Sequence, residues 1–168
     1  MLSSFELFGF MSPALANDIL GFIFESDKPT YRATMSAVAE ARKVRPVFLE
    51  RQPRVQRHAL MMATLAKPSS EMIAASLLRA WLMQKQNAML VDFLNALGLP
   101  HDKGVVENLP ASVPDEQLHA AVELLLSKYP PEPVALYLNA FNGMNEAHWA
   151  NLKAMLETDA RLQLGATA

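Results

Sequence analysis

The sequence contains no cysteine among its 168 residues. This absence excludes a disulfide framework, an iron–sulfur cluster, a cysteine-bearing zinc site and a thiol nucleophile. Glycine is also sparse: the six glycines do not cluster, so the chain lacks the glycine-rich loop that cradles phosphate groups. Several large classes of metalloprotein and nucleotide-binding enzyme are thereby removed from consideration.

Long uninterrupted apolar runs are missing as well. No stretch reaches the roughly 18 apolar residues that indicate a membrane-spanning helix. The apolar segment at the start of the sequence contains Glu6 and precedes the first basic residue, Lys28, so it does not have the positive beginning of a secretory signal. We therefore expect no membrane span and a cytoplasmic location.

The composition is that of a folded globular domain. Hydrophobic residues make up 51% of the chain and charged residues 19%, which argues against intrinsic disorder. The length suits one ordinary domain. The net charge of −2 gives no overall attraction to nucleic acid or to anionic lipid.

Prolines and glycines divide the chain into segments of helical periodicity. Ser12 followed by Pro13 is typical of a helix N-terminus. A later helix opens at Pro53 and repeats apolar residues at helical spacing, namely Val55, Ala59, Met62 and Leu65. The longest segment, about 69–97, is capped by Ser69 or Ser70 and followed by Gly98, a natural helix C-terminal residue. We interpret it as a central helix.

The sequence predicts an all-α fold, because no segment shows sustained apolar–polar alternation. We predict a single-domain bundle of six to seven helices around the central helix. The expected organisation is an aromatic N-terminal arm over 1–12, a helical domain over 13–157 and a C-terminal tail over 158–168 that frays. Trp81 and Trp149 are expected in the core.

The aromatic arm is a candidate interaction segment. Phe5, Phe8 and Phe10 precede the first helix that the pattern predicts, and a free arm would expose an aromatic patch that soluble monomers avoid. The arm could pack on its own bundle, on a second copy, or on another partner or membrane surface. The second alternative predicts a homodimer at micromolar concentration that weakens when residues 1–11 are deleted.

Charge is segregated along the chain, and the segment 42–67 holds seven basic residues against one acidic residue. The candidate interaction residues in it are arginines: Arg42, Arg45, Arg51, Arg54 and Arg57. They could pair with the acidic flanks of the chain or of a second copy, bind an acidic protein partner, or contact phosphate or nucleic acid. Nucleic acid is the least favoured of these, because Pro46 and Pro53 break any continuous basic helix.

The long loop over 98–114 is the most enzyme-like part of the sequence. It gathers four ionisable residues in a stretch long enough to require a reason: His101, Asp102, Lys103 and Glu107. The same residues could instead satisfy exposed backbone. A pocket lined by them would favour ligand binding or catalysis.

No sequence motif assigns an active site, a cofactor or a metal. The four histidines share no helical spacing of ligands, and neither a nucleophile elbow nor a Glu-x-x-His pair occurs. The sequence favours a non-enzymatic helical interaction or scaffolding domain that self-associates. Binding of nucleic acid or a phosphate ligand through 42–57, and small-molecule binding or catalysis at loop 98–114, stay open as alternatives.

Overall fold

The computed structural model describes residues 2–144 and 147–165. Within these ranges the protein is helical, with 73% helix and no strand, so the all-α fold class is confirmed. The chain divides into two compact units: an N-terminal unit over 4–81, and a C-terminal unit over 82–165 together with residues 2 and 3. Each unit is described by itself.

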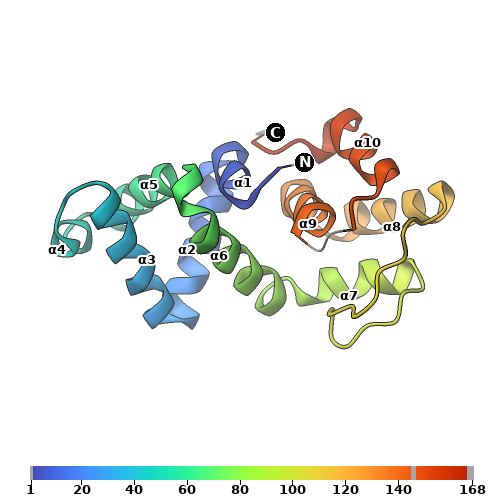
Figure 1. Cartoon of the computed structure of the whole chain (residues 1–168), viewed down its shortest axis with the longest axis horizontal. Helices are drawn as coiled ribbons and strands as arrows, with labels where there is room; N and C mark the ends of the chain where they lie inside the picture. Colours follow the sequence, from blue (N-terminus) through green and yellow to red (C-terminus); the bar gives the residue numbers. More distant parts are fainter. Residues whose placement is uncertain (1, 145–146, 166–168) are drawn as a thin grey trace. The chain divides into compact units, whose positions relative to one another are not determined.

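The N-terminal unit contains the first five α-helices and most of the sixth, whose last three residues belong to the C-terminal unit (Figure 1). They are α1 (Ser4–Phe10), α2 (Pro13–Ser26), α3 (Lys28–Ala41), α4 (Pro46–Glu50), α5 (Arg54–Leu65) and α6 (Glu71–Gln84), with a 3₁₀ turn, η1 (Pro68–Ser70), before α6. Helix α5 packs against α1, α2 and α3, and α4 packs beside α3. The predicted start of α2 is confirmed, because Ser12 Oγ accepts a hydrogen bond from Leu15 N–H at 3.1 Å.

The N-terminal arm is helical, which the sequence did not predict. Helix α1 lies within it, and its Leu7 and Phe8 are fully buried. The cap of α1 comes from far along the chain, since the backbone N–H groups of Ser4 and Phe5 donate to Glu71 Oε1 at 3.0 Å and Oε2 at 2.9 Å. A side chain 66 residues away leaves no local sequence signal. Helix α1 contacts α5 and η1 of its own unit.

The predicted central helix is two helices, and the described residues contain ten α-helices rather than six or seven. Helix α6 ends at Gln84 and α7 begins at Asn87. The break falls where four polar residues follow one another, and Asn87 Nδ2 donates to the backbone oxygen of Lys103 at 2.7 Å. A side chain that binds a loop in this way favours the interruption over a continuous helix.

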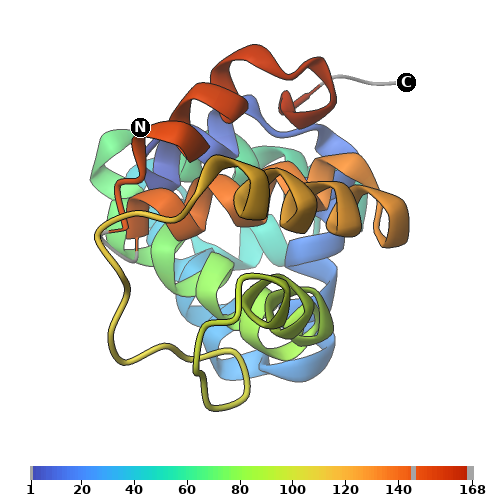
Figure 2. The same cartoon turned by 90° about the vertical axis from the view of Figure 1, so that its right-hand side faces the viewer.

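The C-terminal unit consists of α7 (Asn87–Ala96), α8 (Asp115–Lys128), α9 (Pro131–Met144), α10 (Ala150–Thr158) and the 3₁₀ turn η2 (Ala160–Leu162). Helix α8 contacts α7 and α9, and α9 contacts α10 and η2. Figure 2 shows the 98–114 loop in yellow between α7 and α8. Gly98 adopts φ +66° just after α7, as its predicted role requires. Trp81 and Trp149 are buried, as predicted.

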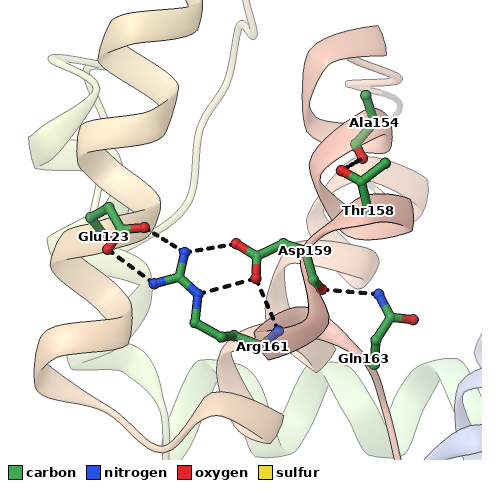
Figure 3. A network of polar contacts seen from close by, with 6 residues as sticks. All are labelled: Glu123, Ala154, Thr158, Asp159, Arg161 and Gln163. Atoms are coloured by element: carbon green, nitrogen blue, oxygen red, sulfur yellow. Dashed lines mark hydrogen bonds and ion pairs between the residues drawn. The ribbon is translucent and has the colours of Figure 1, made fainter.

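The first part of the predicted frayed tail is ordered. Leu162 of η2 is 1% exposed, and Arg161 connects η2 to α8 (Figure 3). The Arg161 guanidinium donates two hydrogen bonds to Glu123, at 2.6 and 3.1 Å, and also binds Asp159. These contacts lower the pKa of Glu123 and of Asp159 below their ordinary values. Residues 166–168 of the predicted tail lie outside the described residues.

Candidate functional site

The candidate site is the outer face of α5. The sequence predicts Val55, Ala59, Met62 and Leu65 as its apolar face, but only Leu65 is buried. The helix is rotated so that it buries a different set of residues: His58, Met61, Thr64 and Leu65. Val55 is consequently 69% exposed. Val55, Ala59 and Met62 therefore form an apolar stripe along α5 that no other element of the unit covers completely.

This stripe borders a pocket of about 340 Å³ among α1, α2 and α5. The lining residues are Phe8 and Gly9 of α1, Pro13, Ala16 and Asn17 at the start of α2, and Val55, His58, Ala59, Met62, Ala63 and Ala66 along α5. Most of these side chains are apolar and small. Phe8 lines the pocket and is itself fully buried. The arrangement suits an apolar ligand group or an apolar helix face.

A buried hydrogen-bond chain supports the pocket wall. Asn17 Oδ1 lies 3.0 Å from His58 Nδ1, and His58 Nε2 lies 2.8 Å from the Tyr31 hydroxyl. An amide oxygen can only accept, so Nδ1 carries the proton and Nε2 accepts from the Tyr31 O–H. Asn17 Nδ2 has no hydrogen-bond partner in the described part of the chain, which leaves its two N–H donors at the pocket wall.

The side chains in this hydrogen-bond network are uncharged at neutral pH. Burial, helped by the nearby positive charges of Arg54 and Arg57, lowers the pKa of His58 to about 4. Burial also raises the pKa of Tyr31, with the charge of Arg57 opposing it. At neutral pH the imidazole is therefore uncharged and the hydroxyl protonated. A histidine in that state, with both nitrogens engaged, suits positioning of the helices better than proton transfer to a ligand.

The three arm residues have different positions. Phe8 is buried and lines the pocket, Phe5 is half-buried, and Phe10 is 57% exposed. The arm therefore packs on its own chain, which was one of the three predicted alternatives. Of the three phenylalanines, Phe10 presents the largest free surface to a partner.

The predicted arginines fall into two groups. Arg54 and Arg57 lie against rings, with their guanidinium carbons 5.1 and 5.9 Å from the centre of the Phe24 ring, and Arg54 also approaches Glu25 at 3.9 Å. The side chains of Arg42, Arg45 and Arg51 are exposed and make no hydrogen bond or ion pair within the described residues. Most of the positive charge in 42–51 is thus left without an acidic partner there.

The loop residues organise the loop itself. Asp102 and Val105 pair through backbone hydrogen bonds of 2.8 and 2.9 Å around a turn in which Lys103 and Gly104 have φ of 51° and 91°. His101 Nδ1 accepts from Gly104 N–H at 3.1 Å, and its Nε2 lies 2.8 Å from Asn95 Oδ1. Both histidine nitrogens are therefore engaged, Nδ1 by the backbone of the loop and Nε2 by Asn95 of α7.

The four loop candidates are only partly brought together. Asp102, Lys103 and Glu107 are exposed, whereas His101 is half-buried. Within the described part of the chain, the Glu107 side chain makes no hydrogen bond or ion pair with the other three. The loop geometry thus accounts for His101 without a ligand.

Two further observations bear on the class of protein. Across residues 2–144 and 147–165, no group of three or more potential ligand side chains is placed to hold a metal ion. In the same ranges, no helix combines the length and the apolar character that crossing a membrane requires. Comparison with family models, with curated proteins and with solved structures finds no match.

Proposed function

We propose that this chain is a non-enzymatic protein-interaction domain that uses the α5 face to bind an apolar helix, and that a second copy of the chain supplies that helix. The observation that carries the proposal is the unpartnered stripe of α5 beside the pocket of about 340 Å³. A cytoplasmic location stays a prediction.

The surface has the properties of a helix-binding groove. Ala59, Ala63 and Ala66 recur at helical spacing and present little volume, so a second helix could approach the backbone of α5 closely. Val55 and Phe10 offer exposed apolar surface. In a two-fold dimer the same patch meets itself, so each copy would cover the stripe of the other.

The structure of the arm changes how this proposal must be tested. Deleting residues 1–11, the test that the sequence suggested, would remove the buried residues Leu7 and Phe8 and with them part of the core. A point substitution on the exposed face of α5 avoids this loss. Ala63→Glu places a charge in the apolar groove, and Ala33→Glu places the same charge at an exposed position of α3.

The experiment is sedimentation equilibrium of the full chain over a range of concentrations. The wild type and Ala33→Glu should dimerise at micromolar concentration, and Ala63→Glu should weaken the dimer at least about tenfold, since a desolvated charge costs more than 1.4 kcal/mol. A wild type that remains monomeric would refute self-association. A dimer that tolerates Ala63→Glu would remove the α5 face as its interface.

A further inference from the structure

A second surface of the N-terminal unit, none of whose residues lines the pocket, combines positive charge with exposed apolar side chains. It is formed by the end of α3 and by α4, and we call it the α3–α4 corner: Arg42, Lys43, Arg45, Val47, Phe48 and Arg51. Figure 1 shows α4 in teal beside α3. All six residues are exposed.

The positive charge of the corner is available to a ligand. The side chains of its four basic residues make no hydrogen bond or ion pair within the described part of the chain. One acidic residue, Glu50, lies in the segment, and it is also exposed. Four basic side chains within ten residues form a local field that the net charge of −2 conceals.

The apolar side chains of the corner are exposed on the same side as its basic side chains. Val47 is 43% exposed and Phe48 is 48% exposed, while Leu49 between them and Glu50 is fully buried. Positions 47, 48 and 51 of a helix lie within about 100° of one another, away from position 49. Val47, Phe48 and Arg51 therefore lie on the same exposed side of α4, whereas Leu49 packs into the core of the unit.

One basic residue occupies a position that is costly for it. Lys43 adopts φ 57° at the end of α3, where Val44 N–H donates to Ala39 O at 2.9 Å. Glycine is the usual residue in this helix-ending motif, because a side chain is strained at positive φ. A lysine is thus present at a position where glycine would be more stable, which supports a binding role for its positive charge.

We propose that the α3–α4 corner binds the surface of a membrane that carries anionic phospholipid headgroups. Val47 and Phe48 would enter the interface between headgroups and acyl chains, and the flexible basic side chains would remain at the headgroup phosphates. Val47 beside Phe48 favours this occupant over nucleic acid, because an aliphatic side chain neither stacks on bases nor binds phosphate. The inference is independent of the groove on α5.

The test is co-sedimentation of the full chain with vesicles of phosphatidylcholine, alone or mixed with phosphatidylserine. Binding is expected with phosphatidylserine at low salt, and it should fall in concentrated sodium chloride. Replacing Arg42, Arg45 and Arg51 by glutamine should weaken binding about 100-fold, since each cation near an anionic surface contributes about fivefold. Phe48→Ser should weaken it about tenfold.

Matched variants separate the corner from general charge and general hydrophobicity. Arg32, Lys67 and Arg79 are exposed cations of the same unit outside the corner, and their triple replacement by glutamine should leave binding unchanged. Met72→Ser, at an exposed apolar residue of α6, should also leave it unchanged. Circular dichroism of each variant checks its fold.

Several results would overturn the proposal. One is an absence of binding to phosphatidylserine vesicles at low salt, and another is equal binding to vesicles of phosphatidylcholine alone. Free inorganic phosphate that competes fully at low concentration would indicate a phosphate site instead. Binding to duplex DNA that depends on the arginines but not on Phe48 would indicate a nucleic-acid surface.

Discussion

The Tyr31 hydroxyl donates a hydrogen bond of 2.8 Å to Nε2 of His58, and this pair joins α3 to the buried side of α5. Both residues are only 2% exposed. Asn17 of α2 completes the chain on the other imidazole nitrogen at 3.0 Å. Three helices are therefore held in register by one neutral imidazole. Its protonation at Nε2 would remove the acceptor of the Tyr31 hydroxyl and break the link to α3, while Nδ1–H would still donate to Asn17.

The first prediction is that stability falls as the pH decreases from about 6.5 to about 4. The pKa of His58 is about 4 in the folded protein and 6.5 ordinarily, so in this window the unfolded chain binds a proton that the folded chain does not. Stability then rises with pH, and the full difference is about 3 kcal/mol. Urea denaturation over this pH range measures it.

The control for this prediction is His58→Gln, which should be less stable at neutral pH but should lack the dependence between 4 and 6.5. Other groups with lowered pKa are carboxyls whose ordinary values are 3.8 to 4.5, so their effect falls mainly below this window: Asp27, Asp92, Glu123 and Asp159. A slope that persists unchanged in His58→Gln would contradict the assignment.

The second prediction concerns the hydroxyl of the pair. Tyr31→Phe should lower the free energy of unfolding by about 1–3 kcal/mol, because it leaves His58 Nε2 buried without a donor. Tyr137→Phe is the matched control: Tyr137 is 3% exposed, and its hydroxyl makes no hydrogen bond within the described residues. Equal losses in the two variants, measured by chemical denaturation, would show that the hydrogen bond to His58 contributes nothing.

The α5 helix illustrates why the sequence predicted the fold class but not the site. Apolar periodicity correctly indicated a helix after Pro53, yet it selected Val55 and Ala59 as the buried face. The structure buries His58 because Tyr31 and Asn17, 27 and 41 residues away, satisfy its nitrogens. Periodicity measures hydrophobicity along one segment, and it cannot register a polar residue whose partners lie on other helices.

Sequence signals predicted helix ends correctly where the interaction that ends the helix involves neighbouring residues. Ser12 caps α2 through a hydrogen bond to a backbone group three residues away, and Gly98 terminates α7 through its own φ. Helix α1 depends instead on the distant carboxylate of Glu71, so the local sequence predicts an arm that precedes the first helix. Contacts between residues far apart in the sequence therefore explain why neither helix α1 nor the buried face of α5 was predicted.

The third prediction tests this distant cap. Glu71→Ala should lower the free energy of unfolding by about 1–2 kcal/mol, because two backbone donors at the start of α1 lose a charged acceptor. Glu71→Gln, which keeps one oxygen acceptor, should cost less. Hydrogen exchange of the α1 amides should accelerate in Glu71→Ala. Unchanged exchange there would show that packing alone maintains α1.

The fourth prediction concerns a glycine inside α2. A Cβ added at Gly21 would lie 2.8 Å from Nη2 of Arg54, so the absence of a side chain there lets Arg54 reach the Phe24 ring. Gly21→Ala gains about 1 kcal/mol of helix propensity but displaces Arg54 from a cation–π contact worth about 0.5–1 kcal/mol. The net change in unfolding free energy should be small.

A double-mutant cycle separates these two contributions. In an Arg54→Gln background, where no guanidinium lies over Gly21, the alanine should stabilise by nearly the full propensity difference of about 1 kcal/mol. If urea denaturation gives the same effect of Gly21→Ala in both backgrounds, Arg54 and Gly21 are not coupled, and the glycine needs another explanation.

The last prediction is that Lys43→Gly stabilises the protein and weakens its binding to anionic vesicles. At φ 57°, glycine relieves strain of about 1 kcal/mol that any side chain with a Cβ retains. Lys43→Ala keeps the Cβ and should therefore give no comparable gain, and Lys67→Gly, at φ −96°, should give none. Thermal or urea denaturation compares the three variants.

The same variants separate backbone strain from charge. Lys43→Gly and Lys43→Ala both remove a cation from the α3–α4 corner, so both should reduce vesicle binding about fivefold, although only the glycine variant is more stable. This opposition between stability and binding is expected where strain is retained at a functional position. An alanine variant as stable as the glycine variant would show that Lys43 is not strained, and binding that survives both substitutions would exclude Lys43 from the membrane contact.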